Sequence, residues 1–253
     1  MVMSLRRRIV KMIDQTVYRE RATALGYPPI LHLHIRKTAG TSFNMGMLSL
    51  LVNDPRKIYE TTAGKLLKCS KTNLGRYCAW DYALAEGANY VFCHTHAPAW
   101  RFSVPREAFV VTILRDPMDR LLSLHRMLTE MFDLRSNHPG LAAERATYRR
   151  DFVDFLQALP DRELMAQLYH FSRDFDIDQA IRLLRRSVTL VGTTEGYDRF
   201  VARFNKHTGY EIPLLHLRQG RASAHDFLGL PASIESKLRR EAMFLEQAVG
   251  VPV

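Results

Sequence analysis

The stretch ILHLHIRKTAGTSF, residues 30–43, decides how we interpret the fold. Leucine and isoleucine alternate with histidine along residues 30–36, which is the two-residue period of a strand with one buried face. A helical pattern follows over residues 41–52, and the run FVVTIL at residues 109–114 is typical of a strand buried on both faces of a parallel sheet. Strands that alternate with helices predict an α/β protein whose central, mainly parallel sheet is flanked by helices.

Outside these two strands the patterns are weaker. Asp116 and Pro117 form a helix start signal, because aspartate caps helix N-termini and proline fits the first helical position. No linker or repeat divides the 253 residues, so we predict a single domain spanning 1–253, with 1–28 as a basic helical extension. We expect helices and loops over 53–89 and a surface loop over 134–147. Further strands are expected at 90–93, 188–191 and 214–217, and further helices at 117–132, 148–158, 161–171, 177–186, 197–207 and 232–248.

Charge and composition limit the partners. The chain has 36 Lys and Arg against 26 Asp and Glu, a formal net charge of +10, so we expect an anionic partner. Hydrophobic residues at 47% exclude a disordered or collagen-like chain. No stretch approaches the roughly 18 apolar residues of a membrane span, so we expect no transmembrane segment and a cytoplasmic location. The three cysteines (Cys69, Cys78 and Cys93) are too few for a disulfide scaffold and fit a reducing compartment.

The turn after the first strand has the composition of an anion site. Small residues let backbone N–H groups face a ligand, and the following helix directs its positive end at the same place. The lysine adds a mobile charge, the hydroxyls add donors, and the glycine is expected to relieve the backbone. The turn residues are Lys37, Thr38, Ala39, Gly40, Thr41 and Ser42. This is not a Walker A loop, because GxxxxGK[ST] is absent, and a plain strand-to-helix turn is the alternative.

A second anion site is indicated where the strand at 109–114 ends. Arg115 follows that strand directly, and the carboxyl ends of parallel strands form the crevice where open α/β sheets bind ligands. Ser123 lies in the second turn of the following helix and can offer a hydroxyl to the same oxyanion. The alternative is that Arg115 forms an ion pair with Asp119 or another carboxylate.

Two histidines follow the strand at 90–93. In an extended segment His94 and His96 point to the same face, whereas Cys93 points to the other. The pair could bind a metal, although no third ligand is obvious, or it could be structural. It could also supply a general base, because histidine titrates near neutrality. The other pair, His32 and His34, is interpreted as structural, with His34 the one that could reach a pocket.

Taken together, these segments resemble a known enzyme family. KTAGTSF after a strand resembles the 5′-phosphosulfate loop of sulfotransferases that use PAPS (3′-phosphoadenosine 5′-phosphosulfate), with Arg36 where the family usually has proline. TILRDPMDRLLSLH, at residues 112–125, resembles the family's 3′-phosphate motif, in which the residues at Arg115 and Ser123 bind that phosphate. FCHTHAPAWRF, at residues 92–102, is similar to the His-x-His segment of heparan sulfate 2-O-sulfotransferases.

The resemblance implies a fold, an activity and residue roles. It implies a P-loop-like nucleotide-binding fold, PAPS as co-substrate, PAP (the desulfated nucleotide) as product, no metal, and a bacterial enzyme. His96 would be the general base with His94 beside it, and Lys37 would stabilise charge on the leaving phosphate. The acceptor would be a hydroxyl, which we expect on a carbohydrate. Arg218 and Arg221 lie in a basic segment that could close over the nucleotide or be a solvated loop.

Two other functions stay open. A nucleotide-dependent phosphotransferase of the kinase type would need a Walker lysine and a carboxylate for magnesium, and the Walker lysine is missing. A nucleic-acid-binding protein would use the positive charge. However, the arginines are dispersed along the sequence and no binding motif of known spacing appears, so we expect no nucleic-acid partner.

Overall fold

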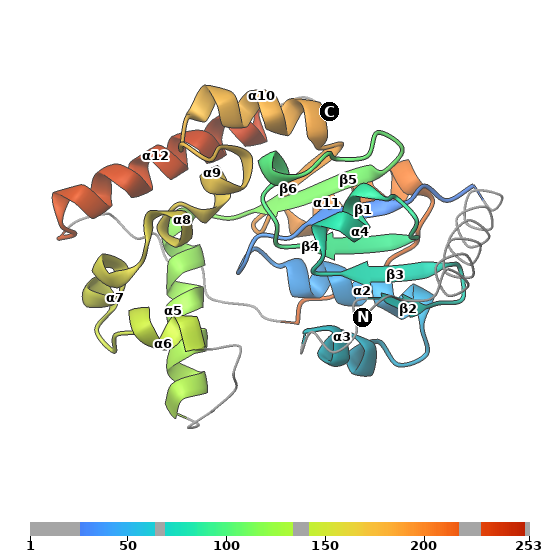
Figure 1. Cartoon of the computed structure of the whole chain (residues 1–253), viewed down its shortest axis with the longest axis horizontal. Coiled ribbons are helices and arrows are strands. Elements are labelled where there is room, and N and C mark those ends of the chain that lie inside the picture. Colours follow the sequence, from blue (N-terminus) through green and yellow to red (C-terminus); the bar gives the residue numbers. More distant parts are fainter. Residues whose placement is uncertain (1–25, 64–68, 134–141, 218–228, 251–253) are drawn as a thin grey trace, which may run out of the picture.

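The structure is a computed structural model that describes residues 26–63, 69–133, 142–217 and 229–250. Its centre is a six-stranded sheet in the order β2-β3-β4-β1-β5-β6 (Figure 1). Neighbouring strands pair in parallel, except that β2 and β3 are antiparallel. The predicted α/β class with a mainly parallel sheet is therefore confirmed. The strands are β1 (Ile30–Leu33), β2 (Cys69–Lys71), β3 (Arg76–Ala79), β4 (Phe92–Thr95), β5 (Phe109–Leu114) and β6 (Leu190–Thr193).

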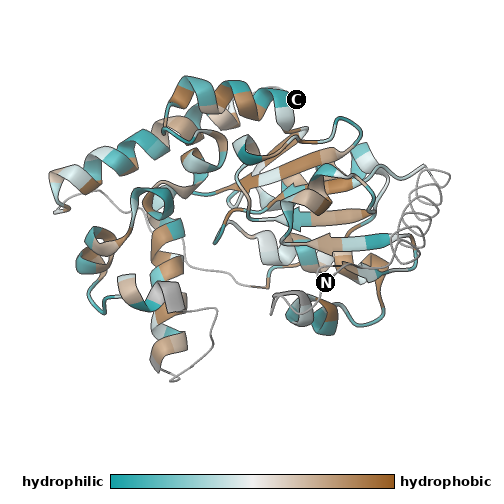
Figure 2. Ribbon diagram, in the orientation of Figure 1, coloured by the Kyte–Doolittle hydropathy of each residue, from teal (hydrophilic) through white to brown (hydrophobic). Residues whose placement is uncertain are grey.

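Helices cover both faces of this sheet. On one face, α2 (Gly40–Leu51) and α11 (Tyr197–Thr208) bury an apolar core that includes Phe43, Phe200 and Phe204. A second core on the other face includes residues of α4 (Tyr82–Glu86), η1 (Ala99–Arg101), α9 (Ala166–Phe171), α10 (Ile177–Ser187) and α12 (Ala232–Val249). Figure 2 shows hydrophobic residues concentrated along the strands, whereas α10 and α12 carry both hydrophobic and hydrophilic bands, as expected of helices with one buried side.

A group of helices continues beyond one end of the sheet. The helix α5 (Pro117–Asp133) leaves the end of β5 and packs against α7 (Phe152–Ala158) and α12 (Figure 1). Asp116 caps α5 as predicted, because its Oδ1 accepts the N–H of Asp119 at 3.0 Å. The remaining helices are α3 (Pro55–Ala63), α6 (Ala142–Thr147) and α8 (Asp161–Leu164).

The carboxyl ends of β1, β4 and β5 lie together at one edge of the sheet. Leu33, at the end of β1, is in register with Thr95 of β4 and Thr112 of β5. After β1 the chain enters α2 on one face, whereas after β4 it enters η1 on the other. Loops that diverge in this way open a crevice between neighbouring strands, which is where open parallel sheets bind ligands.

Most predicted elements are present, with shifted boundaries. The prediction of a strand at 214–217 is wrong: these residues form no strand, and Leu214 and Leu217 are 46% and 44% exposed. The fully buried strand β3 was missed because its four residues begin with an arginine and are too few to show a period. The helix α6 occupies part of the predicted loop at 134–147, of which 134–141 lie outside the described residues.

Two further predictions concern the ends of the chain and its surroundings. Most of the expected 1–28 extension lies outside the described residues, so that extension and the single domain spanning 1–253 stay predictions. Among the helices that the structure describes, none combines the length and the apolar run needed to cross a membrane.

Candidate functional site

A cavity of about 220 Å³ opens at the carboxyl ends of β1, β4 and β5. Most of the residues that the sequence assigned to two separate anion sites and a histidine pair contribute to its wall. These predicted residues are Lys37, Ala39, Gly40, Thr41, Ser42, His96, Arg115 and Ser123. The wall also contains His34, Arg36, Tyr59 and Met127. The structure therefore brings together segments that are far apart in the sequence.

The loop between β1 and α2 has an uncommon backbone. Lys37 and Ala39 have φ angles of 71° and 61°, the left-handed region that residues with a Cβ seldom adopt. Successive residues that alternate between right- and left-handed conformations turn their N–H groups into one concavity, which suits an anion. Thr38 closes the loop from behind, because its buried hydroxyl donates to the Ile35 carbonyl at 2.9 Å. Such strain is typical of ligand-binding loops.

Gly40 has a different role from the one expected. Its φ is not positive, so it does not relieve the backbone, and the left-handed positions belong to Lys37 and Ala39. Instead, a Cβ at Gly40 would overlap the ring of His34. A glycine is therefore required because the first turn of α2 lies directly against this histidine.

Arg115 reaches from the end of β5 to residues 37–42, the segment predicted to bind an anion, which we call the anion loop. Its Nη1 donates to the Lys37 carbonyl at 3.4 Å, and its Nη2 lies 4.0 Å from the Asp119 carboxylate. The alternative ion pair with Asp119 is therefore present, at the edge of the usual range, and binding of an anion by Arg115 stays a prediction. Burial lowers the pKa of Arg115, against the opposing effect of Asp119. Its buried Nε has no hydrogen-bond partner among the described residues, so one donor of the guanidinium is left unsatisfied in the structure. Ser123 lines the same cavity.

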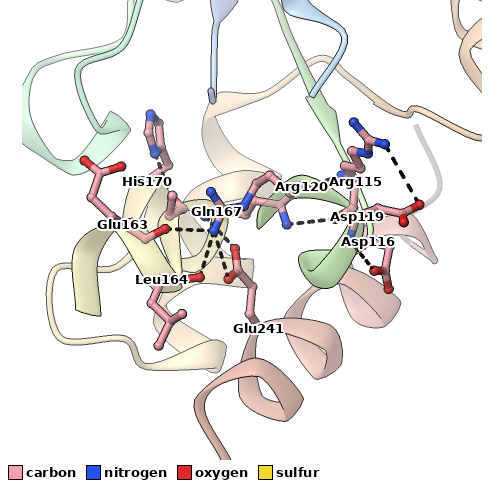
Figure 3. A network of polar contacts seen from close by, with 10 residues as sticks. Arg115, Asp116, Asp119, Arg120, Glu163, Leu164, Gln167, His170 and Glu241 are labelled. Carbon is pink, nitrogen blue, oxygen red and sulfur yellow. Dashed lines mark hydrogen bonds and ion pairs between the residues drawn. The ribbon is translucent and has the colours of Figure 1, made fainter. Parts of the chain in front are cut away.

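A buried network fixes the main chain of Arg115 (Figure 3). Gln167, on α9, accepts the Arg115 N–H at 2.7 Å and donates to the Arg115 carbonyl at 2.8 Å. Glu241 of α12 accepts the backbone N–H of Gln167 at 2.8 Å and lies 3.8 Å from Arg120. Arg120 donates to the carbonyls that end α8. Burial raises the pKa of Glu241, and Arg120 opposes this shift.

The ring of His96 is held in one tautomer. Its Nδ1 is hydrogen bonded to the His34 carbonyl oxygen. A carbonyl can only accept, so Nδ1 carries the proton and Nε2 keeps its lone pair. The ring packs against Trp80, with centroids 4.5 Å apart. Burial lowers the pKa of His96 to about 3, so the imidazole is neutral at pH 7. A neutral ring with a free Nε2 lone pair is the form that a general base requires.

His94 does not share the position of His96. Its side chain is fully buried and does not line the cavity. The Nδ1 of His94 is 3.1 Å from the hydroxyl of Tyr77, and its ring packs edge to face with Trp80. Burial also lowers its pKa well below the usual value. In this arrangement His94 does not contact a ligand in the cavity and can affect one only through neighbouring side chains.

His34 is the cavity residue that sequence reasoning placed in a structural role. Its ring lies 4.4 Å from that of His96 and forms part of the wall. Asn44 of α2 accepts from His32 Nδ1 at 2.7 Å and donates to His34 Nδ1 at 3.4 Å, so it orders both rings. The available signal was a second His-x-His pair on a strand that ends at the anion loop. Only the pairing of β1 with β4 shows that the two pairs are neighbours.

Two other expectations bear on ligands. Arg218 and Arg221 lie outside the described residues. The described chain before them ends beside the cavity, since the N–H of Leu217 donates to the Ser42 hydroxyl at 3.2 Å. Within the described ranges, no cluster of three or more His, Cys, Asp or Glu side chains is arranged to hold a metal ion.

A much larger hollow, about 1040 Å³, lies away from this cavity, at the amino ends of β5 and β6. We call it the arginine groove, because its wall carries the side chains of Arg106, Arg173, Arg182, Arg185 and Arg186. No acidic side chain is among its described lining residues.

Comparison with known proteins adds no assignment. A scan against protein-family models finds no match to this chain, and a search of curated proteins finds none either.

Proposed function

We propose that the protein is a sulfotransferase of the P-loop-like fold that moves a sulfuryl group from PAPS to a hydroxyl acceptor. One observation carries this proposal: the anion loop, Arg115 with Ser123, and His96 line a single cavity. Two cationic side chains, Lys37 and Arg115, in the wall of one cavity suit a nucleotide that carries anionic groups at both its 5′ and 3′ positions. The unpartnered Nε of Arg115 and the left-handed loop backbone both fit an anionic ligand.

The transfer requires positioning and charge stabilisation more than covalent participation by the protein. The acceptor oxygen attacks the sulfur, the bond from sulfur to the 5′-phosphate oxygen breaks, and PAP leaves with that electron pair. Lys37 and the loop N–H groups stabilise the charge that builds on the leaving phosphate. Arg115 and Ser123 hold the 3′-phosphate and so set the register of the nucleotide.

The proton of the acceptor hydroxyl goes to Nε2 of His96. Negative charge of a bound nucleotide beside the ring favours the imidazolium, which raises the pKa of His96 from its low value toward the working pH. Nδ1–H remains on the His34 carbonyl and keeps the ring oriented. His34 and His94 act as positioning residues in this scheme, one in the wall and one behind it.

The acceptor is expected to be a carbohydrate, and the arginine groove supports an acidic one. Its five arginines face an open hollow, and a chain with repeated carboxylate or sulfate groups would neutralise them. A cytoplasmic location remains part of the proposal.

Calorimetry with PAP is the decisive test, with ATP and magnesium in a parallel titration. Micromolar PAP binding that Arg115→Ala weakens by more than a few-fold supports the proposal. Lys37→Ala should leave measurable PAP binding and lower turnover strongly in a mass-detected sulfate-transfer screen of glycans, phenols and lipids. Tight ATP–magnesium binding without PAP binding would instead identify a phosphotransferase.

A further inference from the structure

All three cysteines of the chain lie in one row across neighbouring strands. Cys69 of β2 is directly opposite Cys78 of β3, and Cys78 is directly opposite Cys93 of β4. Residues at matched positions of paired strands project to the same face of a sheet. Cys78 and Cys93 belong to the core on the α4 side, and Cys69 packs against that core. Sheet pairing thus gathers three thiols that are well separated in the sequence.

Cys69 and Cys78 are positioned to form a bond. Their Sγ atoms are 3.0 Å apart, about 1 Å beyond the length of a disulfide, and neither cysteine is part of a disulfide in the structure. Directly opposed residues of antiparallel strands have Cα atoms about 4.5 or 5.5 Å apart. Both spacings lie within the range of about 4.4–6.8 Å that a disulfide spans. The bond can therefore close without rearrangement of the hairpin.

The three thiols differ in their access to solvent. Cys69 is half-buried and lies on β2, the edge strand of the sheet. Cys78 and Cys93 are 2% and 0% exposed. A small reagent in solution consequently meets Cys69 first, and Cys78 is the thiol within reach to resolve the product. Cys93 lies beyond Cys78, on β4, and is buried in the core.

We propose that Cys69 and Cys78 are an oxidation site, where a small disulfide such as oxidised glutathione converts the two thiols into one cross-strand disulfide. The Cys69 thiolate attacks one sulfur of the reagent and displaces a glutathione thiolate, which leaves a mixed disulfide. The Cys78 sulfur gives its proton to water and attacks the Cys69 sulfur, which displaces the second glutathione thiolate. Two protein thiols are oxidised, and one glutathione disulfide is reduced to two thiols.

The site lies beside the residues that support the histidines. The strand β3 carries Tyr77, whose hydroxyl contacts His94, and leads into Trp80, whose ring packs on His96. A covalent link from β2 to β3 therefore fixes the strand behind the cavity wall. Closing a short loop also restricts the unfolded chain.

The test uses the full chain, first reduced and then incubated with oxidised glutathione. Alkylation after denaturation should count one free thiol in place of three, and peptide mapping should find Cys69 joined to Cys78. The melting temperature should rise by about 5 °C and return after treatment with dithiothreitol. The Cys69→Ser variant should gain no disulfide, whereas Cys93→Ala should still form it, and both substitutions avoid the buried Cys78.

Three outcomes would overturn the assignment. They are an unchanged count of three thiols, a stable glutathione adduct on Cys69, and a bond between Cys78 and Cys93. None of these measurements uses PAP or an acceptor, so the proposal stands or fails independently of the proposed activity.

Discussion

The side-chain amide of Gln167 forms two hydrogen bonds with the main chain of one residue, Arg115. It accepts the N–H at 2.7 Å and donates to the carbonyl at 2.8 Å, in the manner of a neighbouring strand (Figure 3). β5 ends at Leu114, so the amide continues strand-like pairing one residue further. The backbone from which the Arg115 guanidinium enters the cavity is consequently set by α9.

This relationship predicts that Gln167→Met weakens PAP binding about tenfold. Methionine keeps the approximate volume but removes both hydrogen bonds, so the backbone of Arg115 is free to shift and the guanidinium loses its fixed approach to the anion. Gln167 is a positioning residue in this account, since it does not line the cavity itself. Titration calorimetry with PAP measures the change.

A double-mutant cycle separates positioning from general damage. If Gln167 acts through Arg115, then Gln167→Met should have almost no further effect on PAP affinity in an Arg115→Ala background. Equal effects in both backgrounds would contradict the mechanism. The exposed Gln157→Met on α7 is the matched control, and it should leave PAP affinity unchanged.

Gly40 provides a second prediction, based on shape. In Gly40→Ala the new methyl group meets the ring of His34, so the first turn of α2 must move away and the anion loop must open. We expect at least tenfold weaker PAP binding and a lower melting temperature. The double variant Gly40→Ala with His34→Ala removes the obstructing ring and should recover the melting temperature relative to Gly40→Ala alone. A fully stable single variant with wild-type affinity would show that the two do not collide.

These two residues show where the sequence was informative and where it was not. The anion loop and Arg115 could be predicted because each follows a strand with a clear apolar pattern, and parallel strands place such residues at one edge. The glycine was predicted for a wrong reason, because a close approach between β1 and α2 has no local signature. Gln167 has no motif at all, and its role appears only when α9 packs beside the end of β5.

The pairing of the strands could not be predicted from the sequence either. Whether β4 lies next to β1 decides if His34 and His96 meet, and no local pattern contains that information. The missed strand β3 also affects the description of the histidines. It carries Tyr77 and leads into Trp80, and both of these side chains contact His94. The wrong strand at 214–217 illustrates the opposite error, because a short apolar run can be exposed coil as readily as a buried strand.

His96→Ala should abolish most turnover and leave PAP binding within about twofold of wild type. A general base contributes roughly 10²–10⁴-fold, and the ring makes no cationic contribution while its pKa is about 3. The pH profile of kcat/KM for PAPS, which reports the free enzyme, should therefore show no acid limb near pH 6.5. Wild-type turnover in His96→Ala, measured by mass-detected sulfate transfer, would remove the base assignment.

Buried histidines predict a loss of stability in mild acid. Burial lowers the pKa of His32 and of His170 to about 4, whereas an unfolded histidine titrates near 6.5. As pH falls from 7 to 5, the unfolded chain binds protons that the folded protein does not accept, so the free energy of unfolding falls. Each such histidine contributes up to about 1.4 kcal/mol per pH unit.

Urea unfolding at pH 7.5 and pH 5.0 measures this effect. The loss of unfolding free energy between pH 7.5 and pH 5.0 should be smaller in His170→Met, which removes one buried histidine on α9. It should be the same as in wild type in the exposed control His207→Gln on α11. A free energy of unfolding that stays constant between the two pH values would mean that the folded protein takes up as many protons as the unfolded chain, so that burial does not lower these pKa values.

The arginine groove predicts how an acidic acceptor is held. Arg182 and Arg186 are exposed and four residues apart on α10, so both lie on the side of the helix that lines the groove. The double variant Arg182→Glu with Arg186→Glu should weaken binding of a size-defined heparin oligosaccharide at least tenfold and leave PAP affinity unchanged.

The control, Arg203→Glu with Lys206→Glu, makes the same change in net charge on α11, across the sheet. Equal weakening in both would assign the binding to net charge alone. Binding of a single-stranded DNA of matched length is measured in parallel. If the DNA binds more tightly than heparin, and the groove variant loses this binding, the groove would be assigned to nucleic acid instead.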